Sequence, residues 1–300
     1  MKKVQFPSQL PRRVTAPCDK LSKKFFNLTE NQYLVVLAKG ATYREDKKGE
    51  VKVEYRLELL EGYEDKLPPD ARHREVLFAC IELYEAGFKV VTPAQIVRHM
   101  TGSEQVNVWP ELKPIIDKLM KTLVTINLEP LKKLNPRRKD SYSKRFKEPK
   151  YKKYLKITGT LLPAQYLESK VNGQETITIE MLTESPLMKV AEFKRQTVTY
   201  DKAPLKIPGK RDTLRQTVIK NCLLRRINLT APSRQKPMNR SIRFETLLTE
   251  CGLADATKRQ KQEARNAVIA LLEHFKAEGV MRDFEIVKSG QVYRSITIMF

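Results

Sequence analysis

The chain has 300 residues, of which 41% are hydrophobic, and a formal net charge of +22 at pH 7. This length and hydrophobic content are sufficient for about two globular domains, each with a core of its own. No apolar stretch is long enough for a membrane span or a secretory signal peptide, so the sequence predicts a soluble, cytoplasmic protein.

Residue types that build catalytic or metal sites are scarce. The chain has three histidines, without H-x-H or H-E-x-x-H spacing: His73, His99 and His274. The four cysteines lie far apart with no C-x-x-C pair, which predicts buried free thiols rather than a disulfide or a zinc site: Cys18, Cys80, Cys222 and Cys251. The segment nearest to a phosphate-binding loop, Gly209-Lys210-Arg211, lacks the upstream glycine and the Ser/Thr. We therefore expect a protein that is not an enzyme and needs no cofactor or metal.

The positive charge is concentrated in two segments. Residues 202–240 contain eleven Lys/Arg and one acid, a net charge of +10, and residues 130–154 contain eleven Lys/Arg and two acids, a net charge of +9. Charge kept only for solubility would be dispersed over the chain. Concentrated basic segments are typical of surfaces that bind a polyanion and release its counterions.

Residues 1–66 predict an N-terminal arm and a β-hairpin that packs on the first domain. The first 30 residues contain three prolines and scattered basic residues. Residues 32–43 and 51–60 are rich in Val, Leu and Tyr and flank Asp46-Lys47-Lys48-Gly49. This pattern indicates two strands joined by a loop of several residues.

Residues 67–184 predict a first winged-helix domain. A helix begins near residue 70, a second begins at Thr92-Pro93-Ala94-Gln95 with capping-box chemistry, and a third covers residues 111–123. A strand at 122–128 follows, and another resumes at 154–158, so the basic segment 130–154 lies between strands. A winged helix carries its wing at such a place, and this one would be an enlarged basic wing. Asn172-Gly173 indicates a further hairpin.

The same order of elements recurs in the second half. Residues 185–210 predict a connector helix that begins at Ser185-Pro186 and an extended linker with Pro204, Pro208 and Gly209. Residues 211–300 predict three helices, at 212–228, 242–250 and 257–278, and a hairpin with strands at 281–287 and 292–299. The predicted fold is therefore α+β, with two tandem winged-helix domains.

The helix at 257–278 has the pattern of a recognition helix. Ala264, Val268, Leu272 and Phe275 lie on one apolar stripe, while the polar residues crowd into the first half. A recognition helix places its N-terminal residues in the major groove, and Arg, Lys, Gln and Asn are the side chains that pair with guanine and adenine edges. The predicted contacts are Lys258, Arg259, Lys261, Gln262, Arg265 and Asn266 on the helix and Lys288, Gln291 and Arg294 at the hairpin tip. The alternative is an ordinary amphipathic helix whose polar side contacts only solvent.

The corresponding helix of the first half is a weaker candidate, because Glu111 and Asp117 offset Lys113, Lys118 and Lys121. The basic segment has few Asn or Gln side chains, so we expect it to contact phosphates rather than bases. Its predicted contacts are Arg137, Arg138, Lys139, Lys144 and Arg145. Its interleaved tyrosines and phenylalanine fit either wing packing or stacking on unpaired bases. Arg225 and Arg226 fit either phosphate contact or complementation of a helix dipole.

Three motifs resemble plasmid and mobile-element replication initiators with tandem winged-helix domains. They are Asp19-Lys20-Leu21-Ser22-Lys23-Lys24-Phe25-Phe26, Ser185-Pro186-Leu187-Met188-Lys189-Val190-Ala191-Glu192-Phe193-Lys194-Arg195-Gln196 and Leu223-Leu224-Arg225-Arg226-Ile227. The resemblance implies that the second domain reads repeats in double-stranded origin DNA, with Lys258, Arg259, Gln262 and Arg265 as base contacts and Lys288, Gln291 and Arg294 as wing contacts. It also implies that the first domain contributes DNA contact and a homodimer interface. This sequence differs from the family in the strong positive charge of the first-domain loop. That charge argues against a first domain that serves only for dimerisation.

The implied function is a nucleoid- or plasmid-associated initiator that prepares an origin for a host helicase or helicase loader. The alternative is a winged-helix transcriptional repressor or regulator with no role in replication. A rolling-circle nickase would need a tyrosine nucleophile beside a cluster of metal-binding histidines, which this sequence does not offer.

Overall fold

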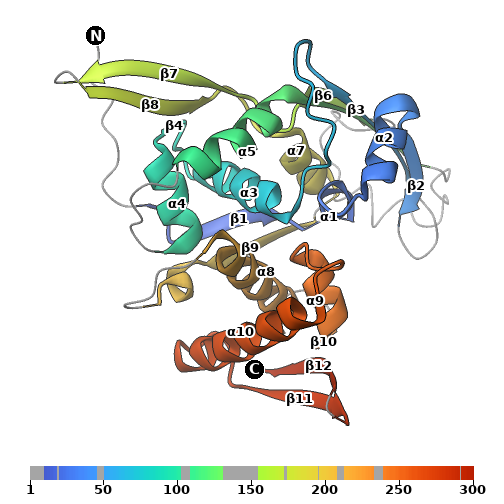
Figure 1. The fold of residues 1–300 in the computed structure, drawn as a ribbon, viewed down its shortest axis with the longest axis vertical. Helices are drawn as coiled ribbons and strands as arrows, with labels where there is room; N and C mark the ends of the chain where they lie inside the picture. Colours follow the sequence, from blue (N-terminus) through green and yellow to red (C-terminus); the bar gives the residue numbers. More distant parts are fainter. Residues whose placement is uncertain are drawn as a thin grey trace, which may run out of the picture.

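The computed structural model describes residues 10–18, 20–45, 51–102, 109–130, 155–171, 174–194, 196–207, 213–232, 239–290 and 292–300. In these ranges, helices pack against four small sheets whose strand pairs are all antiparallel (Figure 1). The expected α+β class is confirmed.

The N-terminal arm is built into the fold by strand pairing. Strand β1 (Arg13–Pro17) pairs with β9 (Thr197–Asp201), with Thr15 opposite Thr199. Helix α1 (Lys20–Phe25) follows, and its Leu21 and Phe25 are buried. A segment that precedes the first domain in sequence therefore pairs with one that follows it.

The prediction of a strand over residues 32–43 was wrong for most of its length. Helix α2 (Glu30–Lys39) occupies this stretch, because Thr29 and Gln32 form a capping box and Gly40 ends the helix with a φ of 72°. Strand β2 (Ala41–Glu45) then pairs with β3 (Val51–Leu59). The predicted loop at 46–49 lies outside the described residues.

The first unit, as we name residues 71–181, contains α3 (Ala71–Glu85), β4 (Val90–Val91), α4 (Pro93–Thr101), α5 (Trp109–Lys121), β7 (Ala164–Val171) and β8 (Gln174–Met181). The predicted capping box of Thr92 and Gln95 is present. Strand β4 pairs with β8, which pairs with β7.

A separate four-stranded sheet interrupts the first unit between α5 and β7. Strands β5 (Thr122–Pro130) and β6 (Leu155–Thr160) pair with each other and extend β2 and β3 in the order β2-β3-β5-β6. The basic segment 131–154, which lies outside the described residues, therefore connects two neighbouring strands of this sheet.

The second unit, residues 214–299, repeats the order of the first. It contains α8 (Leu214–Thr230), β10 (Ser241–Arg243), α9 (Phe244–Glu250), α10 (Lys258–Ala277), β11 (Asp283–Ser289) and β12 (Val292–Met299). The sheet order β10-β12-β11 corresponds to β4-β8-β7, because in both units the short strand after the first helix pairs with the second strand of the hairpin.

The connector is packed rather than extended where it is described. Helix α7 (Pro186–Phe193) contacts β1, β6 and β9, so it belongs to the body of the first unit. The turn η3 (Ala203–Leu205) follows β9, and Lys202, Pro204 and Leu205 are buried. The expected extended linker was thus wrong for residues 202–207, and residues 208–210 lie outside the described residues.

The two units lie along the long axis of the molecule, with β1 and β9 between α3 and α8 (Figure 1). Helices α3 and α8 occupy equivalent places in the two repeats and also contact each other.

Candidate nucleic-acid interface

Helix α10 has a well-defined N-terminus. The backbone N–H of Gln260 donates to Thr257 Oγ1 at 3.3 Å, and the Thr257 N–H donates to Gln260 Oε1 at 3.0 Å. This reciprocal capping box satisfies two N–H groups that would otherwise lack partners in the first helical turn. It fixes the backbone that carries the predicted base contacts.

The two sides of α10 differ as the sequence predicts. Ala264, Val268, Leu272 and Phe275 are buried in the core of the second unit. The opposite side carries exposed polar residues in its first half: Lys258, Arg259, Gln262, Glu263 and Asn266. We call these five residues the exposed face of α10.

Two polar contacts lie along the C-terminal half of α10. Lys276 Nζ lies 2.9 Å from Asp283 Oδ1 on β11, and His274 Nε2 lies 2.8 Å from the carbonyl oxygen of Pro204 in η3. Arg265 is three turns before Lys276 on the same flank, so it lies on the β11 side of the helix. Lys261 and Arg265 are both half-buried, at the margin of the exposed face.

The side chains of the exposed face bond to one another. Arg259 Nε donates to Glu263 Oε1 at 2.9 Å, and Gln262 Nε2 donates to Asn266 Oδ1 at 3.1 Å. Both are pairs one helical turn apart. Sequence reasoning had omitted Glu263, although its i, i+4 spacing from Arg259 was a visible signal.

The hairpin that follows α10 presents cations next to this helix. Lys288 is exposed, and its Nζ lies 4.8 Å from the centre of the Tyr293 ring, a cation–π distance. Arg294 is exposed on β12. Gln291, the third predicted hairpin contact, lies outside the described residues.

The equivalent helix of the first unit offers fewer cations than its sequence suggests. Lys118 is 2% exposed and bonds to Asp65 Oδ2 at 2.6 Å, so it faces no partner outside the protein. Lys113 pairs with Asp117 at 2.7 Å, and Asp117 also accepts from Tyr166 on β7. The weaker DNA contact expected for α5 stays a prediction.

The hairpin of the first unit is acidic. Between Ala164 and Met181 the sequence has Glu168, Glu175 and Glu180 against Lys170, a net charge of −2. This hairpin occupies the place that β11 and β12 occupy in the second unit. A phosphate-binding role for the first unit therefore depends on the basic segment, whose predicted contacts all lie outside the described residues: Arg137, Arg138, Lys139, Lys144 and Arg145.

The basic segment 202–240 is only partly available to a ligand. Lys202, Lys220 and Arg225 are buried, with relative exposures of 7%, 1% and 7%. Both sequence interpretations of Arg225 were wrong, since its guanidinium forms a bidentate pair with Glu75 on α3. The exposed cations that the structure describes in this segment are Lys206, Arg215 and Arg240.

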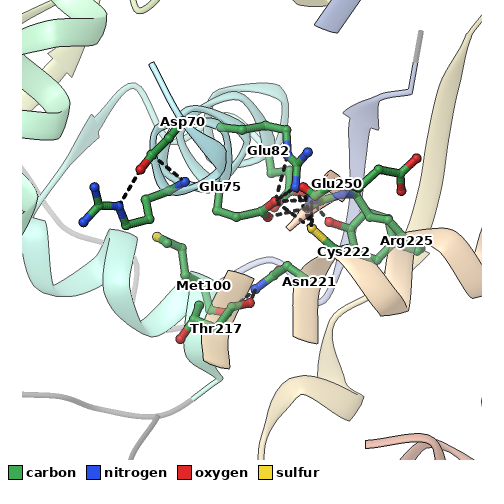
Figure 2. A network of polar contacts seen from close by, with 12 residues as sticks. Asp70, Glu75, Glu82, Met100, Thr217, Asn221, Cys222, Arg225 and Glu250 are labelled. Carbon is green, nitrogen blue, oxygen red and sulfur yellow. Dashed lines mark hydrogen bonds and ion pairs between the residues drawn. The ribbon is translucent and has the colours of Figure 1, made fainter. Parts of the chain in front are cut away.

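Arg225 and Asn221 of α8 bond to residues of the first unit (Figure 2). Glu75 accepts from Arg225 of α8 and from Arg74. Burial alone would raise the pKa of Glu75, but Arg225 and Arg74 outweigh burial and hold its pKa below the usual value. Asn221 of α8 also donates to the carbonyl oxygen of Met100 in α4 at 2.8 Å.

A second buried carboxylate binds the segment that joins the units. Glu82 accepts from His99 at 2.9 Å, from Tyr200 at 2.5 Å and from Lys202 at 2.6 Å. Burial opposes its charge, but Lys202 and His99 stabilise the carboxylate and lower the pKa of Glu82 to about 2. Burial, and then the charge of Lys202, lower the pKa of His99, whose Nε2 lies 2.9 Å from Glu82 Oε2.

Among the described residues, one group could be considered for a metal ion. Glu85, Glu184 and Glu192 have carboxylate oxygens within 4.8 Å of one another. Burial, and then the neighbouring Glu192, raise the pKa of Glu184 to about 7. Exposed acidic clusters of this kind are common without a bound ion.

Three of the four cysteines are buried, and one of them lies beside a small cavity. The expectation of buried free thiols is confirmed for Cys80, Cys222 and Cys251, while Cys18 is only half-buried. A cavity of about 30 Å³ lies beside Arg74, Cys222 and Arg225, and this volume suits a single water molecule.

None of the described helices combines the length and apolar character needed to cross a membrane.

Comparison with known proteins gave structural matches only. No family model and no curated protein matches the sequence. Two solved structures of domains 2 and 3 of RctB match with a TM-score of 0.41, at 12% and 10% sequence identity, over 87% of this chain and 91% of theirs. A likeness at this level does not establish a common fold.

Proposed function

We propose that the protein is a sequence-specific double-stranded DNA-binding protein with two tandem winged-helix domains. The repeated order of helix, short strand, two helices and hairpin supports this proposal, as does the pairing of the short strand with the second hairpin strand in both units. In this arrangement α5 and α10 are the recognition helices and the two hairpins are the wings.

The observation that carries the proposal is the exposed face of α10. Its five polar residues lie together in the capped first half of the helix, and the apolar stripe of α10 packs on the second unit. The proposed DNA contacts are Lys258, Arg259, Lys261, Gln262, Arg265 and Asn266 on α10 and Lys288, Gln291 and Arg294 on the hairpin. Lys258, Arg259, Gln262 and Arg265 would contact base edges, and Lys288, Gln291 and Arg294 would make the wing contacts.

The strand pairing changes the proposed role of the basic segment 131–154. The hairpin β7–β8 pairs with β4 and thus takes the place of the first-unit wing, whereas the basic segment connects β5 and β6. We therefore propose that the segment is a phosphate clamp on the four-stranded sheet, with Arg137, Arg138, Lys139, Lys144 and Arg145 as its contacts.

The proposed biological role is initiation of replication at repeats in a plasmid or mobile-element origin, without catalysis by this chain. Support for this role comes from the sequence motifs described above. A host helicase or helicase loader would be the protein partner, and the first unit would form a homodimer. The alternative role is transcriptional repression or regulation by the same DNA-binding surface.

Selection from a library of random duplexes tests DNA binding directly. The full chain should enrich one motif, and footprinting of the DNA flanking its gene should protect copies of that motif. Enrichment of no motif, with equal affinity for all duplexes, would contradict sequence-specific binding.

A replication assay separates the two biological roles. A plasmid whose only origin is the footprinted DNA should replicate when the protein is supplied and fail when it is absent. A repressor would be dispensable for replication in this assay. Metal-dependent nicking of supercoiled origin DNA by the purified chain would contradict the proposal that it is not an enzyme.

A further inference from the structure

One acidic residue lies within the proposed DNA-contacting part of α10. From Lys258 to Asn266 the sequence is Lys-Arg-Gln-Lys-Gln-Glu-Ala-Arg-Asn, and Glu263 is its only acid. Its side chain is 58% exposed and lies on the same face as Arg259. A carboxylate here repels DNA phosphates, so it weakens binding to any sequence unless it makes a favourable contact of its own.

The bond between Arg259 and Glu263 leaves the two Nη groups of the guanidinium available to contact a base. Glu263 accepts from Nε of Arg259 at 2.9 Å, and it is the one partner of Arg259 that the described residues show. The two terminal Nη groups form the other edge of the planar guanidinium. They are the donors that a bidentate contact to guanine O6 and N7 can use.

We propose that Glu263 is a specificity-determining residue of the DNA-contacting face. It orients Arg259 toward a guanine, and its second carboxylate oxygen accepts from the N4 amino group of a neighbouring cytosine. This inference rests on the proposed function, because it assigns a base-reading role within that DNA-binding surface. Carboxylates accept from cytosine N4 in the major groove, whereas they have no favourable contact with phosphate.

If Glu263 has this role, its removal should change two measured quantities in opposite directions: the affinity for unrelated DNA and the preference for the selected duplex. Removal of the carboxylate abolishes repulsion of phosphates, so affinity for unrelated DNA should rise. It also frees the Arg259 side chain and removes the cytosine contact, so preference for the selected duplex should fall. A merely structural i, i+4 pair would change helix stability slightly and leave the preference unchanged.

The experiment uses the full chain and a duplex selected by the wild-type protein. Dissociation constants are measured for this duplex, for a scrambled duplex, and for duplexes in which single G·C pairs are replaced. Glu263→Ala should bind the scrambled duplex more tightly and lose about 5- to 100-fold in the ratio of selected to scrambled affinity, the range of one good base contact. Glu263→Gln should restore part of the ratio, because its amide oxygen can still accept.

Glu273→Ala is the matched control, since Glu273 is exposed on the same helix outside its N-terminal half. It removes the same charge and should leave the ratio unchanged. Preference for one G·C pair should disappear in Arg259→Ala, and adding Glu263→Ala should not alter that pair further.

An unchanged ratio in Glu263→Ala, or an equal loss in Glu273→Ala, overturns the role of Glu263 while DNA binding stands. A wild-type chain that selects no duplex overturns the proposed function and this inference together. Circular dichroism of each variant verifies that α10 is formed.

Discussion

At the scale of single residues, the two buried glutamates of α3 have a structural role. Glu75 and Glu82 lie two turns apart on α3, and each accepts from a cation that comes from beyond the first unit, Arg225 and Lys202 respectively. A buried charge without its partner costs far more than an exposed one, so these pairs constrain how the units pack.

Replacing Glu75 should destabilise the protein strongly. Glu75→Ala leaves Arg74 and Arg225 buried without their carboxylate, and breaking such a pair costs about 3–5 kcal/mol. Urea unfolding of the full chain measures this free energy. Glu273→Ala, an exposed change, should stay within about 0.5 kcal/mol of wild type. Equal effects of the two substitutions would mean that the pair of Glu75 and Arg225 contributes nothing to the free energy of unfolding.

The dependence of the free energy of unfolding on pH should show the contribution of the ionised Glu82 carboxylate. Its folded-state pKa of about 2 lies below the ordinary value of 4.5, so its contribution is present above about pH 5 and is lost as pH falls toward 2. Each unit of pKa corresponds to about 1.4 kcal/mol, which gives a contribution of about 3 kcal/mol. The groups that face the carboxylate are His99, Tyr200 and Lys202.

The measurement is the free energy of unfolding of wild type minus that of Glu82→Gln between pH 7 and pH 2. The difference should shrink as pH falls, because the glutamine does not titrate. A difference independent of pH would show that Glu82 has the same pKa in the folded and the unfolded protein, and a difference that grows as pH falls would show that the folded state raises its pKa.

At the scale of elements, local capping chemistry decides where helices start. The predicted box at Thr92 was confirmed, and the same box at Thr29 converts an expected strand into α2. The Val and Tyr content of residues 32–43 favoured a strand, but intrinsic strand preference is weak and the cap together with Gly40 defines a helix.

The cap of α10 gives a test at this scale. Thr257→Ala removes the hydroxyl that accepts from Gln260 and should cost about 1 kcal/mol. Since this cap holds the first turn of α10, the substitution should also weaken binding to the selected duplex. Thr213→Ala removes an equivalent cap from α8, a helix that packs against α3 and α4 of the first unit. It should lose stability with no specific loss of DNA affinity, and an equal loss of affinity in both variants would contradict the assignment of α10.

At the scale of the whole molecule, the net charge overstates the number of cations that are available to contact DNA. Lys118, Lys202, Lys220 and Arg225 are buried, and two of them pair with glutamates of α3. Lys202, Lys220 and Arg225 bond to the first unit, whereas the exposed face of α10 lies on the outside of the second unit.

Salt dependence should distinguish exposed from buried cations. The logarithm of affinity should fall with the logarithm of salt concentration, with a slope of about −0.9 for each phosphate contacted. Lys139→Met should reduce the magnitude of the slope by about one and weaken all duplexes alike. Lys220→Met removes the same charge from a buried position and should leave the slope unchanged at temperatures where both variants are folded. Equal slopes for the two variants would contradict the phosphate clamp.

The sequence by itself determined the α+β class, most helix positions and the polar first half of α10, because these follow from local periodicity and capping. Only the tertiary structure decided that the arm pairs with β9, that β7–β8 rather than the basic segment pairs with β4, and that Lys202, Lys220 and Arg225 are buried. A charge count cannot separate solvated cations from paired ones. Strand pairing and ion pairing join residues more than 100 positions apart in the chain, and no local pattern encodes which partner each will meet.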